Sequence, residues 1–351
     1  EVSARRLALL AALAVACGGS TPGGPGARPF GAPAGSWTWV DVQGTSCSDG
    51  SPTGFGVNPG PRADLVVFLD GGGACWDYAT CFVAQLAAPG PVGAAEFAVR
   101  AAGLGGTLFD RADPANPFRD FTFVFVPYCT GDLHAGDAEG SYSPGAGLPP
   151  RRWIHHGRVN VAADLARLRA ELAAPPRLVV AGASAGGFGT LFSYDAFRAA
   201  FPASEASLVD DSGQPLEGDA FNPELRTRWR AAWNIDPVLD AACAGCRDDL
   251  SLIVPALVSR HPADRFALLS STQDAVIRSF ALLPPPLFEA ALRKTVIDRF
   301  DPLPQARTFL VAGDAHVLVA APARYTASGV TLTEWLRQIV ERDPAWKSVG
   351  P

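Results

Sequence analysis

The chain has 351 residues, of which 48% are hydrophobic, so it is long enough to bury one large core, and a single folded domain is expected. Its formal net charge is −6 and no basic stripe runs along it. The electrostatic signature of a nucleic-acid-binding protein is therefore missing, and we expect no nucleic-acid partner.

The first residues have the pattern of an export signal. Arg5 and Arg6 precede an apolar run at residues 7–15, which is too short to cross a bilayer but has the length of a signal-peptide core. We therefore predict a signal peptide over residues 1–16. Cleavage would leave Cys17 at the mature N-terminus, where a bacterial lipoprotein carries its lipid. A lipid at Cys17 would be the only membrane contact, and ordinary secretion without a lipid is the alternative.

A linker and then a series of buried strands follow. Residues 17–36 are rich in Gly and Pro and have few apolar side chains, so we expect a flexible linker there and a folded domain over residues 37–351. Continuous apolar runs are typical of buried parallel strands. The strands expected from such runs cover residues 65–69, 121–126, 178–180, 206–209, 266–271 and 309–312, with an outer strand within residues 37–42.

Helical segments alternate with these strands. Asn160 is expected to cap one amphipathic helix, and a second is expected over residues 188–201. Thr331 and Glu334 have the spacing of a capping box that opens a C-terminal helix. Residues 214–262 show poor periodicity and are expected to form an insertion. The alternation predicts an α/β fold with a mostly parallel sheet and helices on both faces.

The strand at residues 178–180 runs directly into the pattern Gly182-x-Ser184-x-Gly186. The flanking glycines allow a sharp turn from strand to helix that holds the central serine out of the sheet. This is the nucleophile elbow of α/β hydrolases, and it predicts that Ser184 attacks a carbonyl carbon. The alternative is a Gly-rich turn without a chemical role.

Two further reactive groups follow later strands. Asp274 comes after residues 266–271 and His316 after residues 309–312, so the chain order is Ser184, acid, His, as in α/β hydrolases. In such a triad the histidine takes the serine proton and the carboxylate orients and stabilises the imidazole. Separately, Asp274 could be a helix N-cap and His316 a surface residue. Asp211 also follows a strand, but Asp274 follows the last strand before the one that leads to His316, which is the usual place for the acid. Asp211 in addition lies in a sequence typical of turns, so we choose Asp274 as the acid.

A run of three glycines at residues 71–73 follows the strand at residues 65–69. Backbone amides without side chains can approach the oxyanion of a tetrahedral intermediate, so we assign Gly72 and Gly73, with Ala185 directly after the nucleophile, to the oxyanion hole. A dinucleotide phosphate loop would need glycine where Trp76 stands. No cofactor is therefore expected.

Seven cysteines are present, and setting Cys17 aside leaves an even number that could form three disulfides in an exported protein. The Cys-x-x-Cys pair at residues 243 and 246 has no second pair or nearby histidine to complete a zinc site, so we expect a local disulfide and no metal. The sequence alone does not fix the connectivity. The pairs we expect are Cys75 with Cys81, Cys243 with Cys246, and Cys47 with Cys129.

Four of the five histidines remain. His134 lies beyond a strand end and could line a pocket, although it precedes the nucleophile in the chain. His155 and His156 are expected in the turn before the Asn160 helix, and His261 is expected in a loop.

Together, several of these motifs resemble the pectin acetylesterase and Notum family of carboxylesterases. The resemblance covers nearly all of residues 37–346 and is weakest at residues 214–262. It is carried by Cys-Ser-Asp-Gly-Ser-Pro at residues 47–52, Leu-Asp-Gly-Gly-Gly-Ala-Cys-Trp at 69–76, Val-Pro-Tyr-Cys-Thr-Gly-Asp at 126–132 and Gly-Ala-Ser-Ala-Gly-Gly at 182–187. It implies an α/β-hydrolase fold and a serine esterase whose nucleophile, base and acid are Ser184, His316 and Asp274.

One departure from the family concerns its substrate. Where relatives carry an aromatic residue after the paired glycines, this chain has Gly73, beside the expected oxyanion hole. The resemblance implies removal of acetyl groups from an acylated carbohydrate, with deacylation of longer acyl esters or of an acylated protein as the alternative. A surface-tethered binding domain without activity is the hypothesis of another class. The sequence does not determine the oligomeric state.

Overall fold

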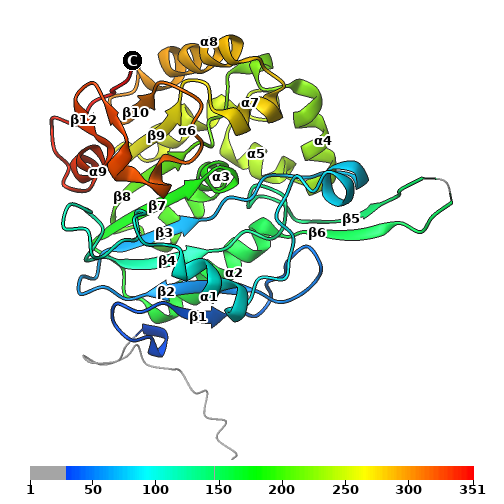
Figure 1. The fold of residues 1–351 in the computed structure, drawn as a ribbon, viewed down its shortest axis with the longest axis horizontal. Coiled ribbons are helices and arrows are strands. Elements are labelled where there is room, and N and C mark those ends of the chain that lie inside the picture. The colour runs from blue at the N-terminus through cyan, green and yellow to red at the C-terminus, as the bar shows by residue number, and fades with distance from the viewer. Residues whose placement is uncertain (1–28, 146) are drawn as a thin grey trace, which may run out of the picture.

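The computed structural model describes residues 29–145 and 147–351. Its centre is an eight-stranded sheet (Figure 1). Six neighbouring strands of this sheet, β4, β3, β7, β8, β9 and β10, pair in parallel, and β2 runs antiparallel to both of its neighbours. In sheet order the strands are β1 Thr38–Asp41, β2 Gly54–Asn58, β4 Thr122–Val126, β3 Leu65–Leu69, β7 Arg177–Ala183, β8 Glu205–Asp211, β9 Arg265–Ser271 and β10 Ala306–Val311. The mostly parallel sheet predicted from the apolar runs is confirmed.

The central strands separate two hydrophobic cores. In β3, Leu65 and Leu69 belong to one core and Val66 and Phe68 to the other, because successive side chains of a strand point to opposite faces. All five residues of β3 are buried. A strand covered on both faces needs no polar side, which explains why these strands are continuous apolar runs.

Helices cover both faces of the sheet. The core on one face includes residues of α2 Gly157–Glu171, α3 Ala185–Ala200, α6 Ile253–Arg260 and α8 Pro285–Thr295, and the core on the other includes residues of α1 Ala94–Ala102 and α9 Leu332–Val340. The hydroxyl of Thr331 accepts a hydrogen bond from the Glu334 amide at the start of α9, as the capping box predicts. The remaining helices are α4 Pro223–Trp233, α5 Asp236–Ala242 and α7 Ala275–Ala281.

Residues 214–262 contain more regular structure than their periodicity suggests. They form α4, α5 and α6. Asn222 caps α4 by accepting from the amides of the next turn, Pro223 occupies the first turn, and Asn234 ends the helix in a left-handed conformation. These capping signals are local, whereas the short helices lack the length that makes an apolar period clear in the sequence.

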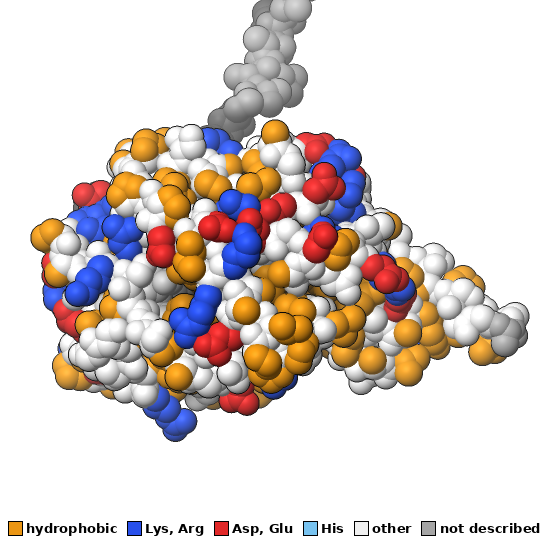
Figure 2. Space-filling view, turned by 90° about the horizontal axis from the view of Figure 1, so that it is seen from above, with side chains coloured by type: hydrophobic (Ala, Val, Ile, Leu, Met, Phe, Trp, Pro, Cys, Tyr) orange, Lys and Arg blue, Asp and Glu red, His pale blue; other side chains and the backbone are white. Residues whose placement is uncertain are grey.

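Several strands were not expected from the sequence. Strand β2 has two glycines among its five residues, which hides its strand pattern in the sequence although every residue is buried. The antiparallel pair β5 Ala138–Tyr142 and β6 Arg151–His155 forms a ribbon that projects from the body of the protein (Figures 1 and 2). The short pair β11 Thr326–Ala327 and β12 Val330–Thr331 completes the strands of the described residues.

The helix expected to start at Asn160 begins one turn earlier, at Gly157. Asn160 therefore lies inside α2, where its side chain accepts from the Ser46 amide and donates to the Ser46 carbonyl, each at 2.9 Å. The cap assignment is wrong because Asn160 bonds to a distant loop instead of to its own helix.

Packing also begins earlier in the chain than residue 37. The ring of Phe30 lies 5.4 Å from that of Phe55, edge to face, and Ala32 is fully buried. Part of the segment expected as a linker, residues 17–36, therefore packs on the core. Cys17 and the expected signal peptide at residues 1–16 lie outside the described residues.

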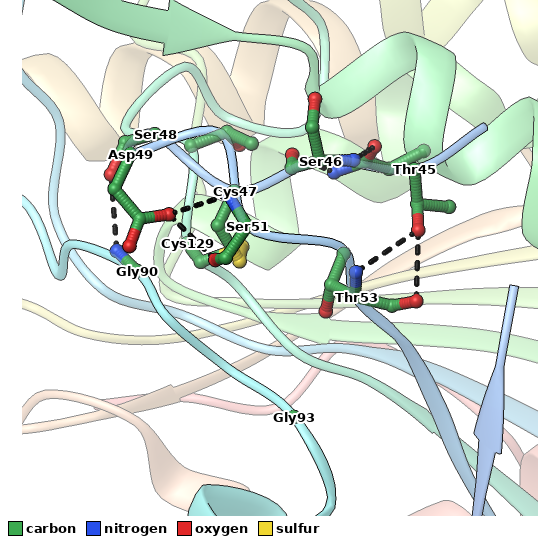
Figure 3. Close-up of a disulfide and its surroundings, with 12 residues drawn as sticks. Thr45, Ser46, Cys47, Ser48, Asp49, Ser51, Thr53, Gly90, Gly93 and Cys129 are labelled. Atoms are coloured by element: carbon green, nitrogen blue, oxygen red, sulfur yellow. Dashed lines mark hydrogen bonds between the residues drawn. A yellow bond between two sulfur atoms is a disulfide. The ribbon is translucent and has the colours of Figure 1, made fainter. Parts of the chain in front are cut away.

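Three disulfides join the same cysteine pairs that the sequence analysis expects: Cys47–Cys129, Cys75–Cys81 and Cys243–Cys246. Figure 3 shows the first, which links the loop after β1 to the loop after β4. The Ser48 amide donates to the Cys129 carbonyl at 2.9 Å beside this bridge. Both loops lie at the carboxyl edge of the sheet, so this covalent bond connects them where the reactive groups gather.

The outermost parallel strand, β10, has a further partner near the C-terminus. Val349 forms a parallel bridge with Phe309, donating to the Thr308 carbonyl and accepting from the Leu310 amide, each at 2.9 Å. The edge of the sheet is therefore covered at this point.

A helix that crosses a bilayer must be both long enough and apolar enough. No single helix in residues 29–145 and 147–351 meets both requirements. One pair meets them jointly, Ala275–Ala281 with Pro285–Phe300, and is bent by 92° at the break between the two helices.

Candidate active site

The turn between β7 and α3 has the geometry of a nucleophile elbow. Ser184 occupies φ 55° and ψ −118°, a conformation that serine rarely adopts, and its amide donates to the Asp211 carbonyl at 2.7 Å. A Cβ at Gly186 would lie 1.9 Å from the Leu69 carbonyl oxygen, so only glycine allows α3 to start this close to β3. The sharp turn at Ser184 therefore depends on the absence of a Cβ at Gly186.

Asp274 and His316 meet beyond the ends of β9 and β10. The carboxylate oxygens of Asp274 lie 2.8 and 3.0 Å from Nδ1 of His316. Asp274 is fully buried and also caps α7, because its Oδ1 accepts from the amides of Val276 and Ile277 at 2.9 Å. The two interpretations of this residue, helix cap and partner of histidine, are therefore both true.

Ser184 and the His316 ring line the same pocket. No hydrogen bond joins the Ser184 hydroxyl to the imidazole within the described residues, and such bonds are often long before a substrate binds. The Asp274 carboxylate holds Nδ1, so Nε2 is the ring nitrogen that can exchange a proton with the pocket.

The loop after β3 presents backbone amides beside Ser184. The amides of Gly72, Gly73 and Ala185 donate to no other group among the described residues. Gly73 has φ +76°, and a Cβ there would lie 1.9 Å from the Leu86 carbonyl oxygen. An aromatic side chain therefore cannot occupy this position without a different backbone. All three amides line cavities that include Ser184, where an oxyanion would form.

Two cavities of very different size meet at Ser184. The larger has a volume of 660 Å³ and is bounded by the glycine loop, α1 and the segment after His316. The smaller has a volume of only 20 Å³ and is lined mainly by apolar side chains. These side chains include Leu133, Phe188, Phe221, Trp229, Ile277 and Phe280.

Asp70, at the end of β3, carries the charge nearest the glycine loop. Burial raises its pKa to about 6, and the Arg100 guanidinium from α1, which forms an ion pair with it, acts in the opposite direction. Both side chains line the larger cavity. The residue following a buried strand could have pointed to Asp70, but nothing in the sequence connects it to Arg100.

His134 lies behind this loop and not in the cavities at Ser184. Its Nε2 donates to the Asp70 carbonyl at 2.9 Å, and its ring lies 4.8 Å from the Tyr128 ring. Burial lowers the pKa of His134 to about 4, so the ring is neutral at physiological pH. The structure gives His134 a packing role and does not bring it into the pocket at Ser184.

The other histidines are also engaged in local contacts. His155 ends β6 and is fully buried, with Nδ1 2.9 Å from the Thr130 carbonyl oxygen. His156 precedes α2, and His261 ends α6 with Nε2 2.7 Å from Asp195. Among the described residues, no group of three or more His, Cys, Asp or Glu side chains could hold a metal ion.

The chain is similar in sequence to known proteins. A family model described as Pectinacetylesterase matches residues 37–238. Pectin acetylesterase 5 of Arabidopsis thaliana is 27% identical over 225 residues, covering 61% of this chain and 50% of that protein. Palmitoleoyl-protein carboxylesterase NOTUM of Drosophila melanogaster is 25% identical over 188 residues, covering 51% of this chain and 27% of that protein. The matched regions thus span half or less of these relatives' own lengths.

Solved structures agree on the fold. The Wnt deacylase Notum from Drosophila superposes with a TM-score of 0.64 at 16% identity, covering 88% of this chain and 94% of that one. At this identity the match establishes the α/β-hydrolase fold. The family model covers more than half of the chain, including the glycine loop, the elbow and the strand before Asp211. This chain therefore belongs to the pectinacetylesterase family.

Proposed function

We propose that the protein is an exported serine carboxylesterase in which Ser184 is the nucleophile, His316 the general base and Asp274 the residue that orients the imidazole. The strained elbow, the free Nε2 of His316 and the pair of short contacts to Asp274 support these roles. The named relatives are esterases, which agrees with the chemistry of the site.

The reaction follows from these positions. The Ser184 hydroxyl adds to the ester carbonyl while His316 Nε2 takes its proton, and the amides of Gly72, Gly73 and Ala185 bind the oxyanion. His316 then gives the proton to the departing alcohol, which leaves an acyl group on Ser184. A water molecule, deprotonated by His316, attacks this acyl-enzyme and releases the carboxylic acid and free Ser184.

The size of the smaller cavity supports an acetyl group as the acyl group of the substrate. Its 20 Å³ is little more than the space that one water molecule needs, so it accepts the methyl of an acetyl group and no longer chain. The cavity of 660 Å³ on the other side of Ser184 then receives the alcohol. An O-acetylated polysaccharide is the proposed substrate, as the names of the plant relatives suggest.

A second candidate, deacylation of longer acyl esters, is favoured by the lining of the larger cavity. Phe68, Phe109 and Phe125 contribute apolar rings to it. If the acyl chain occupied this cavity, the protein would resemble in substrate the relative named as a palmitoleoyl-protein carboxylesterase.

Hydrolysis of p-nitrophenyl acetate, butyrate and octanoate distinguishes these candidates. We expect kcat/KM to be highest for acetate and acetate to be released from an acetylated polysaccharide. Preference for octanoate would replace the first candidate with the second. A fluorophosphonate probe should label Ser184 and fail to label Ser184→Ala; no labelling of a folded wild-type protein would support a binding domain without activity.

Export is proposed on the signal pattern before Cys17 and on the three disulfides, which form in oxidising compartments. Mass spectrometry of the membrane fraction should find a diacylglyceryl group on Cys17. A soluble mature protein without that group would leave plain secretion as the route.

A further inference from the structure

The segment Asp211-Ser212, at the end of β8, touches both halves of the proposed active site. Its backbone accepts from the Ser184 amide at 2.7 Å. Its side chains bind the segment that follows His316: Asp211 Oδ2 accepts from the Val319 amide at 2.7 Å, and Ser212 Oγ accepts from the Val317 amide at 3.1 Å. Two consecutive residues therefore connect the nucleophile turn to the histidine segment.

The segment they bind is in a conformation that needs support. Val317, directly after His316, has φ 65° and ψ 91°. A β-branched residue adopts a positive φ only where its surroundings hold it there. Ser212 itself has φ 61°, and its hydroxyl donates to Asp211 Oδ1 at 3.0 Å, so the three residues form one hydrogen-bonded unit.

The Asp211 side chain in this unit is a buried acid. Asp211 is fully buried, and burial raises its pKa to about 6, while the amides of Val319 and Leu318, the Ser212 hydroxyl and nearby His316 act in the opposite direction. The carboxyl is therefore ionised at neutral pH. The preceding Asp210 accepts from the Gly213 amide at 2.8 Å, and Asp274 approaches His316 through the ring nitrogen Nδ1.

We propose that Asp211 and Ser212 are positioning residues that hold the His316 segment in register with Ser184. This inference rests on the proposed esterase activity. It gives Asp211 a role different from that of the triad acid. Its carboxylate binds the Val319 amide, three residues after His316, whereas Asp274 binds Nδ1 of the His316 ring.

The first test compares Asp211→Asn with Asp210→Asn, which alters a neighbouring buried carboxyl that does not bind the histidine segment. Asn has one acceptor oxygen where Asp211 uses two, so Asp211→Asn loses the contact to either the Val319 amide or the Ser212 hydroxyl. With p-nitrophenyl acetate, it should lower kcat on the order of 10²-fold and leave KM within about twofold, because misplacing a catalytic group by about 1 Å has that effect. Asp210→Asn should leave both kcat and KM within about twofold of wild type.

The second test is Ser212→Gly, which removes the hydroxyl and suits the positive φ at this position. A positioning role predicts that kcat falls while Tm stays the same or rises. Parallel loss of kcat and Tm, or no change in kcat, would overturn the role of Ser212 and show that the segment matters only for folding. This variant decides the question if Asp211→Asn does not fold.

Ser184→Ala distinguishes failure of the positioning role from failure of the proposed esterase function. If Ser184→Ala is inactive while Asp211→Asn has wild-type kcat, the positioning role is wrong and the proposed esterase stands. If Ser184→Ala retains full turnover, the proposed function itself fails.

Discussion

Asp274 combines a proposed catalytic role with an observed capping role, and a pair of substitutions separates the two. Asn is about as good an N-cap as Asp, so Asp274→Asn should keep the start of α7 and the stability of the fold. It should nevertheless lower kcat by as much as about 10⁴-fold, because the amide favours the wrong tautomer of His316. Ester turnover and thermal unfolding measure the two effects.

Asp274→Ala is the matched comparison. It should lose the same activity and in addition about 1 kcal/mol of stability, because the amides of Val276 and Ile277 lose their acceptor. Near-normal turnover by a folded Asp274→Asn protein would transfer the acid role to another carboxylate.

A second prediction at this scale concerns Asp164 in α2. It is buried, its Oδ1 has no hydrogen-bond partner among residues 29–145 and 147–351, and burial raises its pKa to about 8. The folded state keeps the proton while the unfolded state releases it near pH 4, so this residue makes stability fall as pH rises from about 4 to 8. The limit is about 1.4 kcal/mol per pH unit. Urea unfolding between pH 5 and 8 should show Asp164→Asn with a flatter profile than wild type.

Glu171→Gln provides the control for Asp164, since Glu171 lies in the same helix but pairs with Arg167 at the surface. It should leave the pH profile of stability almost unchanged. Equal profiles for wild type and Asp164→Asn would mean that Asp164 is solvated or ionised in the folded protein.

The sequence indicates which candidate site residues lie together at one edge of the sheet, but it does not indicate the residues that support them. Ser184, Asp274 and His316 each follow an apolar strand, and parallel strands bring their carboxyl ends to one edge of the sheet. Asp211 also follows a strand, but the direction of its side chain depends on packing that no local pattern records. For this reason the choice between Asp211 and Asp274 rested on strand order, and the contacts from Asp211 to the histidine segment could not be foreseen.

Helix α7 lies between the small cavity at Ser184 and another pocket, which is distinct from the cavity of 660 Å³. Phe280, at the end of this helix, lines both the cavity of 20 Å³ at Ser184 and a pocket of 370 Å³ bounded by α4 and Trp76. Phe280→Ala should join the two and admit a longer acyl chain. We expect the ratio of kcat/KM for octanoate to that for acetate to rise by about tenfold or more.

Leu282→Ala is the control, because Leu282 lines only the larger of these two pockets and is 75% exposed. It should leave acyl preference as it is. If both variants changed the ratio equally, or neither did, Phe280 would not limit the length of the acyl group.

Elements with one strong signal were predictable, and those that depend on distant contacts were not. The buried strands β3, β4 and β7 stand out as apolar runs because both of their faces are covered. Strand β2 does not, since its pairing with β1 and β4 and not its own side chains makes it a strand. In the ribbon, β5 alternates exposed and partly buried residues, and β6 is exposed at its first two residues and buried at its last three, so neither strand has a long apolar pattern to detect.

For the whole molecule, the Cys47–Cys129 disulfide is the strongest covalent constraint. It spans 82 residues, whereas Cys243–Cys246 spans three. In the chain-entropy model these bridges are worth about 4.5 and about 2 kcal/mol. Replacing Cys47 and Cys129 by Ala should therefore lower the free energy of unfolding more than replacing Cys243 and Cys246, as measured by denaturant titration. The reverse order would show that strain or residual structure outweighs loop length.

The domain as a whole was predictable because its length, strand alternation and motifs agree on one fold. Its N-terminal limit was not, since Phe30 and Ala32 lie in a Gly- and Pro-rich stretch whose composition is typical of a linker. Phe30 lies against Phe55 and Ala32 is part of the same core, and the composition of a whole stretch does not reveal two such side chains.

The pairing of Val349 with β10 has a consequence for the integrity of purified protein. An uncovered strand edge offers free amides and carbonyls to a second chain and is a common starting point for aggregation. Trimming of residues 347–351 by a protease would expose Thr308 to Leu310 in this way while leaving the pocket at Ser184 intact. We expect the trimmed protein to retain its initial activity and to form soluble oligomers during storage, as light scattering would detect. A trimmed protein that stays monomeric would show that α9 and the turn after it shield this edge by themselves.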